Sequence, residues 1–319
     1  MYKIKQVPED FFVKELSKAE FDEEGEYTYF VIVKRNYTTI GALQQIARRL
    51  KVPLKKFGFA GNKDKLAVTK QLCSARGVSK ERLEGLKIKD IRIEYVGQGK
   101  EPISLGDLRG NSFRIVVRDL PHKRLTLKSI ERLPNYFGEQ RFSRHNAAIG
   151  RALVRRNFSK AVELIDDPDV RSYSETYPGD YIGALRQLPL KIRRIYVHAY
   201  QSWIWNKTVE EYVKKEKPIK NEKIPIVGFG TEIKSDKVGR IINKILQQEA
   251  ITQRDFIISQ MKEVTAEGGE RDLFVKPIDF DIKLGKDELN EGKHKAVIYF
   301  TLPKGSYATV VIKDLFSLL

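Results

Sequence analysis

The sequence contains a single cysteine, Cys73, among its 319 residues. An internal disulfide and a thiolate metal cluster are therefore excluded, and Cys73 is expected to be a small core residue. The four histidines are scattered without ligand spacing, so no metal site is expected. No apolar run is long enough to span a bilayer, and the first residues do not resemble a signal peptide. We therefore expect a cytoplasmic protein with no membrane-spanning segment.

Acidic side chains are outnumbered by basic ones. The sequence has 42 Asp and Glu residues against 59 Lys and Arg residues, which gives a formal net charge of +17. That excess favours a polyanionic partner and leaves the fold open. Nucleic acid is the first candidate and an anionic membrane surface is the second. A chain of this length can bury a full core and divide into two domains.

Several common catalytic motifs are missing. Residues 97–100 (GQGK) look faintly like a phosphate loop, but they lack the further glycine and the Lys-Ser/Thr ending. No serine or cysteine occupies a nucleophile elbow. The remaining catalytic candidate is a carboxylate, that of Asp64. It lies where a glycine-containing loop, residues 57–63, meets a strand-like alternation that includes Leu66 and Val68. A solvated turn is the competing interpretation, and the segment considered alone favours it.

The order of elements predicts an α+β protein. Strands are expected at residues 27–34, 91–96 and 112–118, and antiparallel or mixed pairing is favoured because helices do not alternate regularly with strands. Helices then predominate, including one at residues 147–164 and one at 193–214. Strands return near residue 273. We therefore expect a catalytic domain made of residues 1–130 and 270–319, with a mostly helical domain, residues 131–269, inserted into it.

Five segments in the same order carry a family resemblance. Residues 61–71 (GNKDKLAVTKQ) resemble the signature of the TruD family of tRNA pseudouridine synthases. The other four are residues 8–11 (PEDF), 110–113 (GNSF), 134–142 (PNYFGEQRF) and 302–309 (LPKGSYAT). The resemblance implies a pseudouridine-synthase domain with a mixed or antiparallel sheet and a TRUD-type insertion. It also implies isomerisation of uridine in tRNA, at position 13, with no cofactor, no membrane partner and no protein partner.

The resemblance also implies roles for individual residues. Asp64 would be the catalytic nucleophile, while Phe11, Asn111 and Tyr307 would hold the target nucleotide. Tyr307 stands where the family has phenylalanine, and its ring can stack equally well. Phe113, on the same strand as Asn111, is expected to lie under the site.

A reacting carboxylate must be ionised, which requires a nearby cation. Lys63 and Lys65 flank Asp64, but neighbours in an extended backbone point to the opposite face. We therefore predict that Lys5 or Arg118 pairs with Asp64. A surface position on its strand is the alternative for Arg118.

The predicted helix at residues 147–164 places Arg151, Arg155 and Arg156 close to one face. Such a stripe is either a solvated surface or a set of contacts to tRNA phosphates, and the basic composition gives the second interpretation weight. Two other functions compete with the enzymatic one. A non-catalytic RNA-binding assembly protein would use the same basic surface. A methyltransferase would need a nucleotide-cofactor glycine loop, which we do not find.

Overall fold

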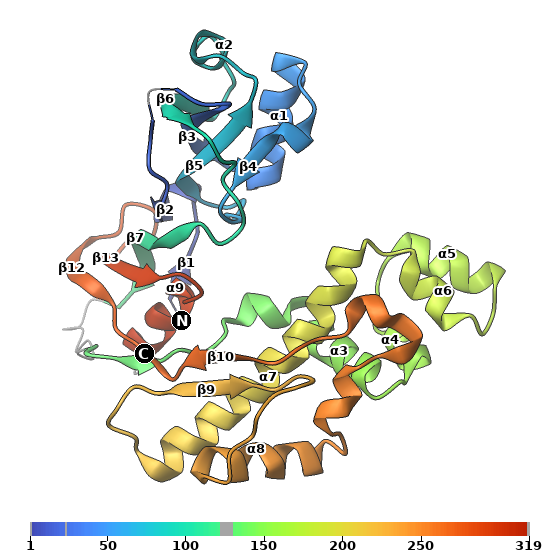
Figure 1. Ribbon diagram of the computed structural model, residues 1–319. Coiled ribbons are helices and arrows are strands. Elements are labelled where there is room, and N and C mark those ends of the chain that lie inside the picture. Colours follow the sequence, from blue (N-terminus) through green and yellow to red (C-terminus); the bar gives the residue numbers. More distant parts are fainter. Residues whose placement is uncertain (1, 23, 122–129, 318–319) are drawn as a thin grey trace. The chain divides into compact units, whose positions relative to one another are not determined.

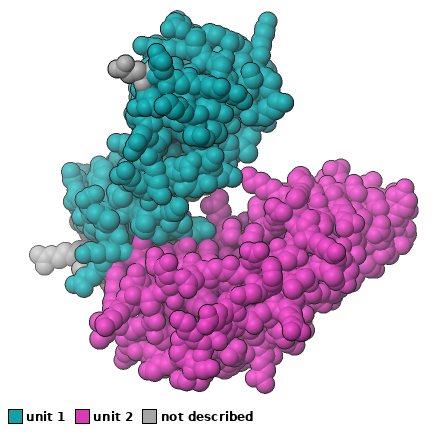
Figure 2. All heavy atoms as spheres, viewed as in Figure 1, with its two compact units in different colours: residues 1–131, 276–319 teal, residues 132–275 magenta. Residues whose placement is uncertain are grey.

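The computed structural model describes residues 2–22, 24–121 and 130–317. It forms two compact units, shown in different colours in Figure 2: unit 1 comprises residues 1–131 and 276–319, and unit 2 comprises residues 132–275. Unit 1 is thus assembled from both ends of the chain, while unit 2 is one continuous segment. The return to unit 1 comes six residues later than the predicted domain boundary at 269/270.

Unit 1 is built on a nine-stranded sheet with the order β12-β13-β7-β2-β5-β3-β6, to which β1 adds against β7 and β4 against β5. Only β2 and β5 run parallel, so the sheet is mixed, as the sequence predicted. The strands are β1 (Lys3–Ile4), β2 (Phe11–Ser17), β3 (Tyr27–Arg35), β4 (Phe57–Phe59), β5 (Val68–Arg76), β6 (Ile91–Gly99), β7 (Leu108–Leu120), β12 (Ile278–Lys286) and β13 (His294–Pro303).

Short helices accompany this sheet (Figure 1). They are η1 (Pro8–Asp10), α1 (Thr39–Leu50), η2 (Leu54–Lys56), α2 (Lys80–Glu84) and α9 (Ala308–Leu315). The Thr38 hydroxyl caps α1 by accepting from the Gly41 N–H at 3.0 Å. The buried face of α1 packs against Phe30 and Ile32 of β3, which fixes the start of α1 over the sheet.

Strand β7 joins the two ends of the chain. Along one edge it pairs with β1 and then β2, with Ile4 opposite Val117 and Phe11 opposite Ile115. Along the other edge it pairs with β13. Near the termini the rings of Tyr2 and Phe316 lie 5.2 Å apart, and Figure 1 marks the two ends close together. Residues from the start, middle and end of the sequence therefore share one face of the sheet.

Unit 2 is mostly helical. Its elements are β8 (Leu133–Pro134), η3 (Glu139–His145), α3 (Asn146–Val154), α4 (Phe158–Glu163), α5 (Pro168–Thr176), α6 (Tyr181–Arg186), α7 (Leu190–Glu216), β9 (Lys223–Ile226), α8 (Lys237–Gln248), η4 (Gln253–Phe256), η5 (Ser259–Val264), β10 (Gly269–Asp272) and β11 (Phe274–Val275). The 27-residue α7 runs through its middle and buries Tyr200 and Trp205 in the core (Figure 1).

The helix predicted at residues 147–164 is wrong as one element, because α3 ends at Val154 and α4 starts at Phe158. Between them Arg156 has φ +57°, a left-handed conformation that interrupts a helix. The Asn157 side chain then caps α4 by accepting from the Lys160 N–H at 3.0 Å. Arg155 and Arg156 thus lie in a helix break and not along a continuous helix face.

Candidate active site

The loop that carries Asp64 is tied to the start of α1 and to β5. The Thr39 hydroxyl accepts from the backbone N–H of Lys63 at 2.8 Å and donates to Gln71 Oε1 at 2.8 Å. The Gln71 amide in turn donates to the carbonyl of Gly61 at 3.1 Å. Thr39 and Gln71 are buried, so these bonds are shielded from water. The loop before β5 is therefore held by side chains from two elements, which limits how far Asp64 can move.

A buried lysine, Lys34, also holds the loop that carries Asp64. Lys34, at the end of β3, has no exposed surface, and its ammonium donates to the carbonyls of Tyr37 at 2.5 Å and Asp64 at 3.1 Å. Burial lowers the pKa of Lys34 to about 8, and the nearby charge of Asp64 opposes that shift. At neutral pH this lysine adds a positive charge beside Asp64.

A buried ion pair fixes the residue just before Asp64. Lys63 Nζ lies 2.5 Å from Glu15 Oε2, and both side chains are almost fully buried. Burial raises the pKa of Glu15, while the charge of Lys63 lowers it. Lys63 thus points to Glu15 on β2 and does not pair with its chain neighbour Asp64.

The carboxylate of Asp64 pairs with Lys5. Lys5 Nζ lies 2.5 Å from Asp64 Oδ2, and the two side chains remain 21% and 31% exposed. The same ammonium lies 4.2 Å from the centre of the Phe11 ring, a cation–π contact. Lys5 has φ +57°, so the chain kinks between β1 and β2 where it delivers this side chain. Of the two predicted partners, the structure shows Lys5 with Asp64.

The prediction that Arg118 pairs with Asp64 is wrong, and so is the surface alternative. Arg118 is buried, and its guanidinium binds the carboxylates of Asp10 at 2.8 Å and Asp287 at 2.7 Å. Glu288 adds a third contact at 3.1 Å. The reason is strand geometry: Arg118 is an odd number of residues from Phe113 along β7 and so faces the opposite side of the sheet.

The aromatic residues gather on the face that Lys5 touches. The Phe113 ring lies 6.3 Å from Phe11, edge to face, and 5.3 Å from Phe300, stacked. Asn111 shares this face of β7, opposite Glu15 of β2 and Leu302 of β13. Its Oδ1 is buried, and no hydrogen-bond partner for that atom exists among the residues that the structure describes. An unpartnered buried acceptor suits a ligand that brings its own N–H.

Contacts thus connect Asp64, Lys5, Phe11 and Phe113, and strand register places Asn111 beside Phe113. Tyr307 is placed by topology: it is half-buried at the N-cap of α9, five residues after Leu302, the partner of Asn111.

Sequence reasoning missed Lys34 and Glu15. Each continues the buried alternation of its strand, after Phe30 and Ile32 in β3 and after Phe11 and Val13 in β2. A charged residue at an interior strand position was the available signal.

The three arginines of the predicted stripe have different surroundings. Arg151 forms two hydrogen bonds to Glu249, at 2.6 and 3.3 Å. Arg156 donates to the carbonyls of Val154, Asp255 and Ile257, and thereby joins two segments of unit 2. Arg155 is exposed, and we find no ion pair for it in the described part of the chain. Of the three, Arg155 is therefore the exposed cation for which the described residues supply no ion-pair partner.

Comparison with known proteins decides the family. The family model for tRNA pseudouridine synthase D (TruD) matches residues 2–176, 169–223 and 221–315. The chain belongs to the TruD family. A TruD relative from Methanococcoides burtonii is 30% identical over 98% of this chain and 92% of its own length. The tRNA pseudouridine synthase D of Aquifex aeolicus is 28% identical over 98% of both chains.

A solved TruD structure from Methanosarcina mazei has the same fold. It aligns with a TM-score of 0.76 and 27% identity over 99% of this chain and 93% of that one. The α+β fold predicted for a TruD protein is thereby confirmed. The non-catalytic RNA-binding alternative is not favoured, since the matched family is one of enzymes. Among the described helices none combines the length and apolarity needed to cross a membrane.

Replacing Lys34 by methionine is expected to change how stability depends on pH. Because the folded-state pKa of Lys34 is below its usual value, the unfolded chain binds more protons between about pH 8 and about pH 10.5. The unfolding free energy of the native protein should therefore rise by up to about 3 kcal/mol relative to the variant across that window. Urea unfolding at a series of pH values measures this. The exposed Lys65→Met variant is the control, and its unfolding free energy should depend on pH as that of the native protein does.

Proposed function

We propose that this protein isomerises uridine to pseudouridine in tRNA, at position 13, with Asp64 as the reacting carboxylate. The observation that carries the proposal is the Lys5–Asp64 ion pair, whose carboxylate lies on the loop that resembles the TruD signature. An opposite charge at hydrogen-bond distance favours the ionised form of a carboxyl group. A cytoplasmic location follows from the proposed tRNA substrate.

The chemistry requires only a rearrangement within the nucleotide. The bond from ribose C1′ to uracil N1 breaks with its electron pair on N1, the base turns, and C5 bonds to C1′. C5 then loses its proton and N1 gains one. Nothing is oxidised and no group is imported, so no cofactor is required. Asp64 either attacks the sugar or removes a proton from it, and both routes use the ionised carboxylate.

The surrounding residues suit a nucleotide that has left its stack. In this proposal the rings of Phe11 and Tyr307 replace the stacking lost by the extruded uracil, and Phe113 supports Phe11 from beneath. The buried Oδ1 of Asn111 accepts from the N–H of the uracil edge, and its amide can donate to a carbonyl. Fixed donors around the detached base stabilise the charge that develops on it.

Basic residues of unit 2 contact the tRNA backbone in this proposal. Arg155 is exposed and can reach a phosphate directly. Arg151 is also half-exposed but shares its charge with Glu249, and Arg156 acts by holding the segment in place. We therefore assign the strongest phosphate contact of the three to Arg155.

The deciding test maps pseudouridine in total RNA from cells with and without this protein. We expect modification at tRNA position 13 to appear only when the protein is present. Modification at another tRNA uridine would keep the reaction and change the site. Identical maps would exclude the proposed function.

Replacing Lys5 by methionine is expected to lower kcat by about 100-fold, because Asp64 loses the positive charge that orients its carboxylate. KM for tRNA should change little, since Lys5 acts through Asp64 and not on the bulk of the tRNA. Steady-state kinetics at saturating and limiting tRNA separates the two parameters. Lys65→Met, which removes an exposed charge from the same loop, should keep native kcat. A Lys5→Met enzyme with native kcat would contradict the assignment.

A further inference from the structure

An aromatic stack in unit 2 ends at a surface pocket. The rings of Phe256 and Tyr200 are stacked with centroids 6.2 Å apart, and those of Tyr200 and Trp203 with centroids 6.0 Å apart. Phe256 and Tyr200 are buried, whereas Trp203 is only half-buried. Trp203 lines a cavity of about 340 Å³, with Phe142 of η3 on its wall. The stack thus ends in an aromatic ring with open space beside it.

One wall of this pocket is polar and rigid. Glu249, at the end of α8, accepts from the Tyr200 hydroxyl at 2.8 Å and from Arg151 Nε at 2.6 Å. Both Arg151 and Glu249 line the pocket. The pocket therefore combines an aromatic platform with hydrogen-bonding groups held in fixed positions, which is how proteins bind unstacked nucleobases.

A basic hollow adjoins the aromatic pocket. A second cavity, of about 450 Å³, shares Ala148 and Arg151 with the first and is lined further by Arg155 and Lys160. Lys160 is half-exposed and pairs with Glu163 at 2.5 Å, an exposed contact that a phosphate can replace. Cations thus lie next to the aromatic platform, as base and phosphate lie next to each other in a nucleotide.

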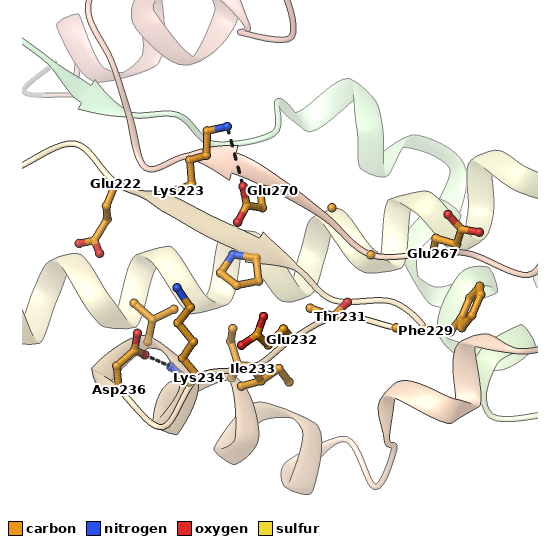
Figure 3. Close-up of a pocket in the computed structure, with 17 residues that line it drawn as sticks. Glu222, Lys223, Phe229, Thr231, Glu232, Ile233, Lys234, Asp236, Glu267 and Glu270 are labelled. Carbon is orange, nitrogen blue, oxygen red and sulfur yellow. Dashed lines mark hydrogen bonds and ion pairs between the residues drawn. The ribbon is translucent and has the colours of Figure 1, made fainter.

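The larger cavity of unit 2 has the opposite character. It measures about 710 Å³ and lies between the β9–β10 pair and the start of α8 (Figure 3). Its charged lining residues are five carboxylates and two lysines: Glu222, Glu232, Asp236, Glu267, Glu270, Lys223 and Lys234. The Asp236 carboxylate is used to cap α8 through the Gly239 N–H at 2.8 Å. An acidic lining repels a polyanion, so this cavity is not where RNA binds.

We propose that the aromatic pocket binds one unpaired nucleotide of the tRNA, distinct from the uridine that is isomerised. Its base stacks on Trp203 beside Phe142, and its phosphate lies against Arg155 and Lys160. The inference rests on the proposed function in that the ligand is part of the tRNA substrate. It also gives a role to Phe142, the last residue of the family-like segment 134–142.

Two kinds of substitution distinguish a stacking contact to the base from an ionic contact to the phosphate. Trp203→Ala should weaken tRNA binding about tenfold, with an unchanged slope of log Kd against log salt, because stacking releases no counterions. Arg155→Gln should also weaken binding but reduce that slope by about one. Trp203→Phe, which keeps a ring, should bind more tightly than Trp203→Ala. Tyr181→Ala removes an exposed aromatic outside the pocket and should bind as the native protein does.

Fluorescence measured at saturating tRNA gives a readout that does not depend on differences in affinity or on activity. The chain has two tryptophans, and Trp205 is fully buried, so stacking of a base should quench Trp203. We expect tRNA to quench the native protein and to leave Trp203→Phe unquenched. This comparison shows whether a tRNA base stacks on Trp203 even if the Trp203→Ala variant fails to fold.

Native affinity in a folded Trp203→Ala variant, or no quenching of the native protein by tRNA, would overturn the inference. A salt slope altered by Trp203→Ala, or equal weakening in Trp203→Phe, would overturn the stacking role. Binding measured with the Asp64→Asn protein keeps turnover out of the comparison. If the native protein makes pseudouridine in tRNA but Trp203 is not needed for binding, only this inference fails. If no tRNA is modified at all, the proposed function itself fails.

Discussion

Replacing Asp64 by asparagine is expected to lower kcat for pseudouridine formation by about 10⁴-fold or more, because an amide neither attacks a sugar carbon nor takes up its proton. The exchange is nearly isosteric, and the loop is held by Thr39, Gln71 and Lys34 independently of the carboxylate. Affinity for tRNA should therefore stay close to native. Loss of the C5 hydrogen, followed as tritium release from tRNA labelled at uridine C5, measures turnover directly.

The exposed Asp22→Asn variant is the matched control and should keep native turnover. Substantial activity in Asp64→Asn would remove Asp64 from the reaction, whatever its position beside Lys5. Loss of both activity and tRNA affinity would indicate a collapsed loop. A folded protein that binds tRNA without turnover is the result that the enzymatic account requires.

Replacing Arg118 by methionine is expected to lower the unfolding free energy by about 3–5 kcal/mol, because it leaves carboxylates buried without their cation. Asp10 and Asp287 have fully buried side chains, and both are bound to Arg118. Although burial opposes it, the pKa of Asp287 is held well below its usual range by the N–H groups of Asp119 and Leu289 and by Asn290 and Arg118. For a unit of this size the loss corresponds to a fall in Tm of roughly 10 °C.

Arg109→Met, an exposed position on the same strand β7, is the control and should unfold close to the native protein. The comparison also shows which of Lys5 and Arg118, the two partners predicted for Asp64, contributes to turnover. Arg118→Met should lose stability while the folded molecules turn over normally, and Lys5→Met should lose turnover. A native Tm with slow turnover in Arg118→Met would instead connect Arg118 to the chemistry.

The strands could be predicted from the sequence because their signal is local. Residues 27–34 are β-branched and aromatic, and β3 spans Tyr27–Arg35. The break at Arg155 and Arg156 was harder, since the apolar spacing continues through it. The local cue was Asn157, a good N-cap residue for the second helix. The left-handed turn at Arg156, by contrast, is held by hydrogen bonds to carbonyls about 100 residues away, which no local pattern shows.

Some residues of the site could likewise be predicted from the sequence, and others could not. The family resemblance indicated Asp64, and the need for a nearby cation predicted Lys5 or Arg118 as its partner; the structure has Lys5 in contact with Asp64. Arg118 was misassigned because two of its partners, Asp287 and Glu288, lie about 170 residues away, beyond the reach of local patterns. Strand alternation alone would have placed Arg118 on the face opposite Phe113. Lys34 and Glu15 were missed because buried charges are stabilised by partners that only the folded chain supplies.

The pairing of β7 with β13 has a consequence for synthesis. A nascent chain that has not reached residue 294 has no strand to cover that edge of β7, whereas all of unit 2 has already been translated. We expect unit 2 to gain its structure on the ribosome first, and the uridine-binding face to be completed only as translation ends.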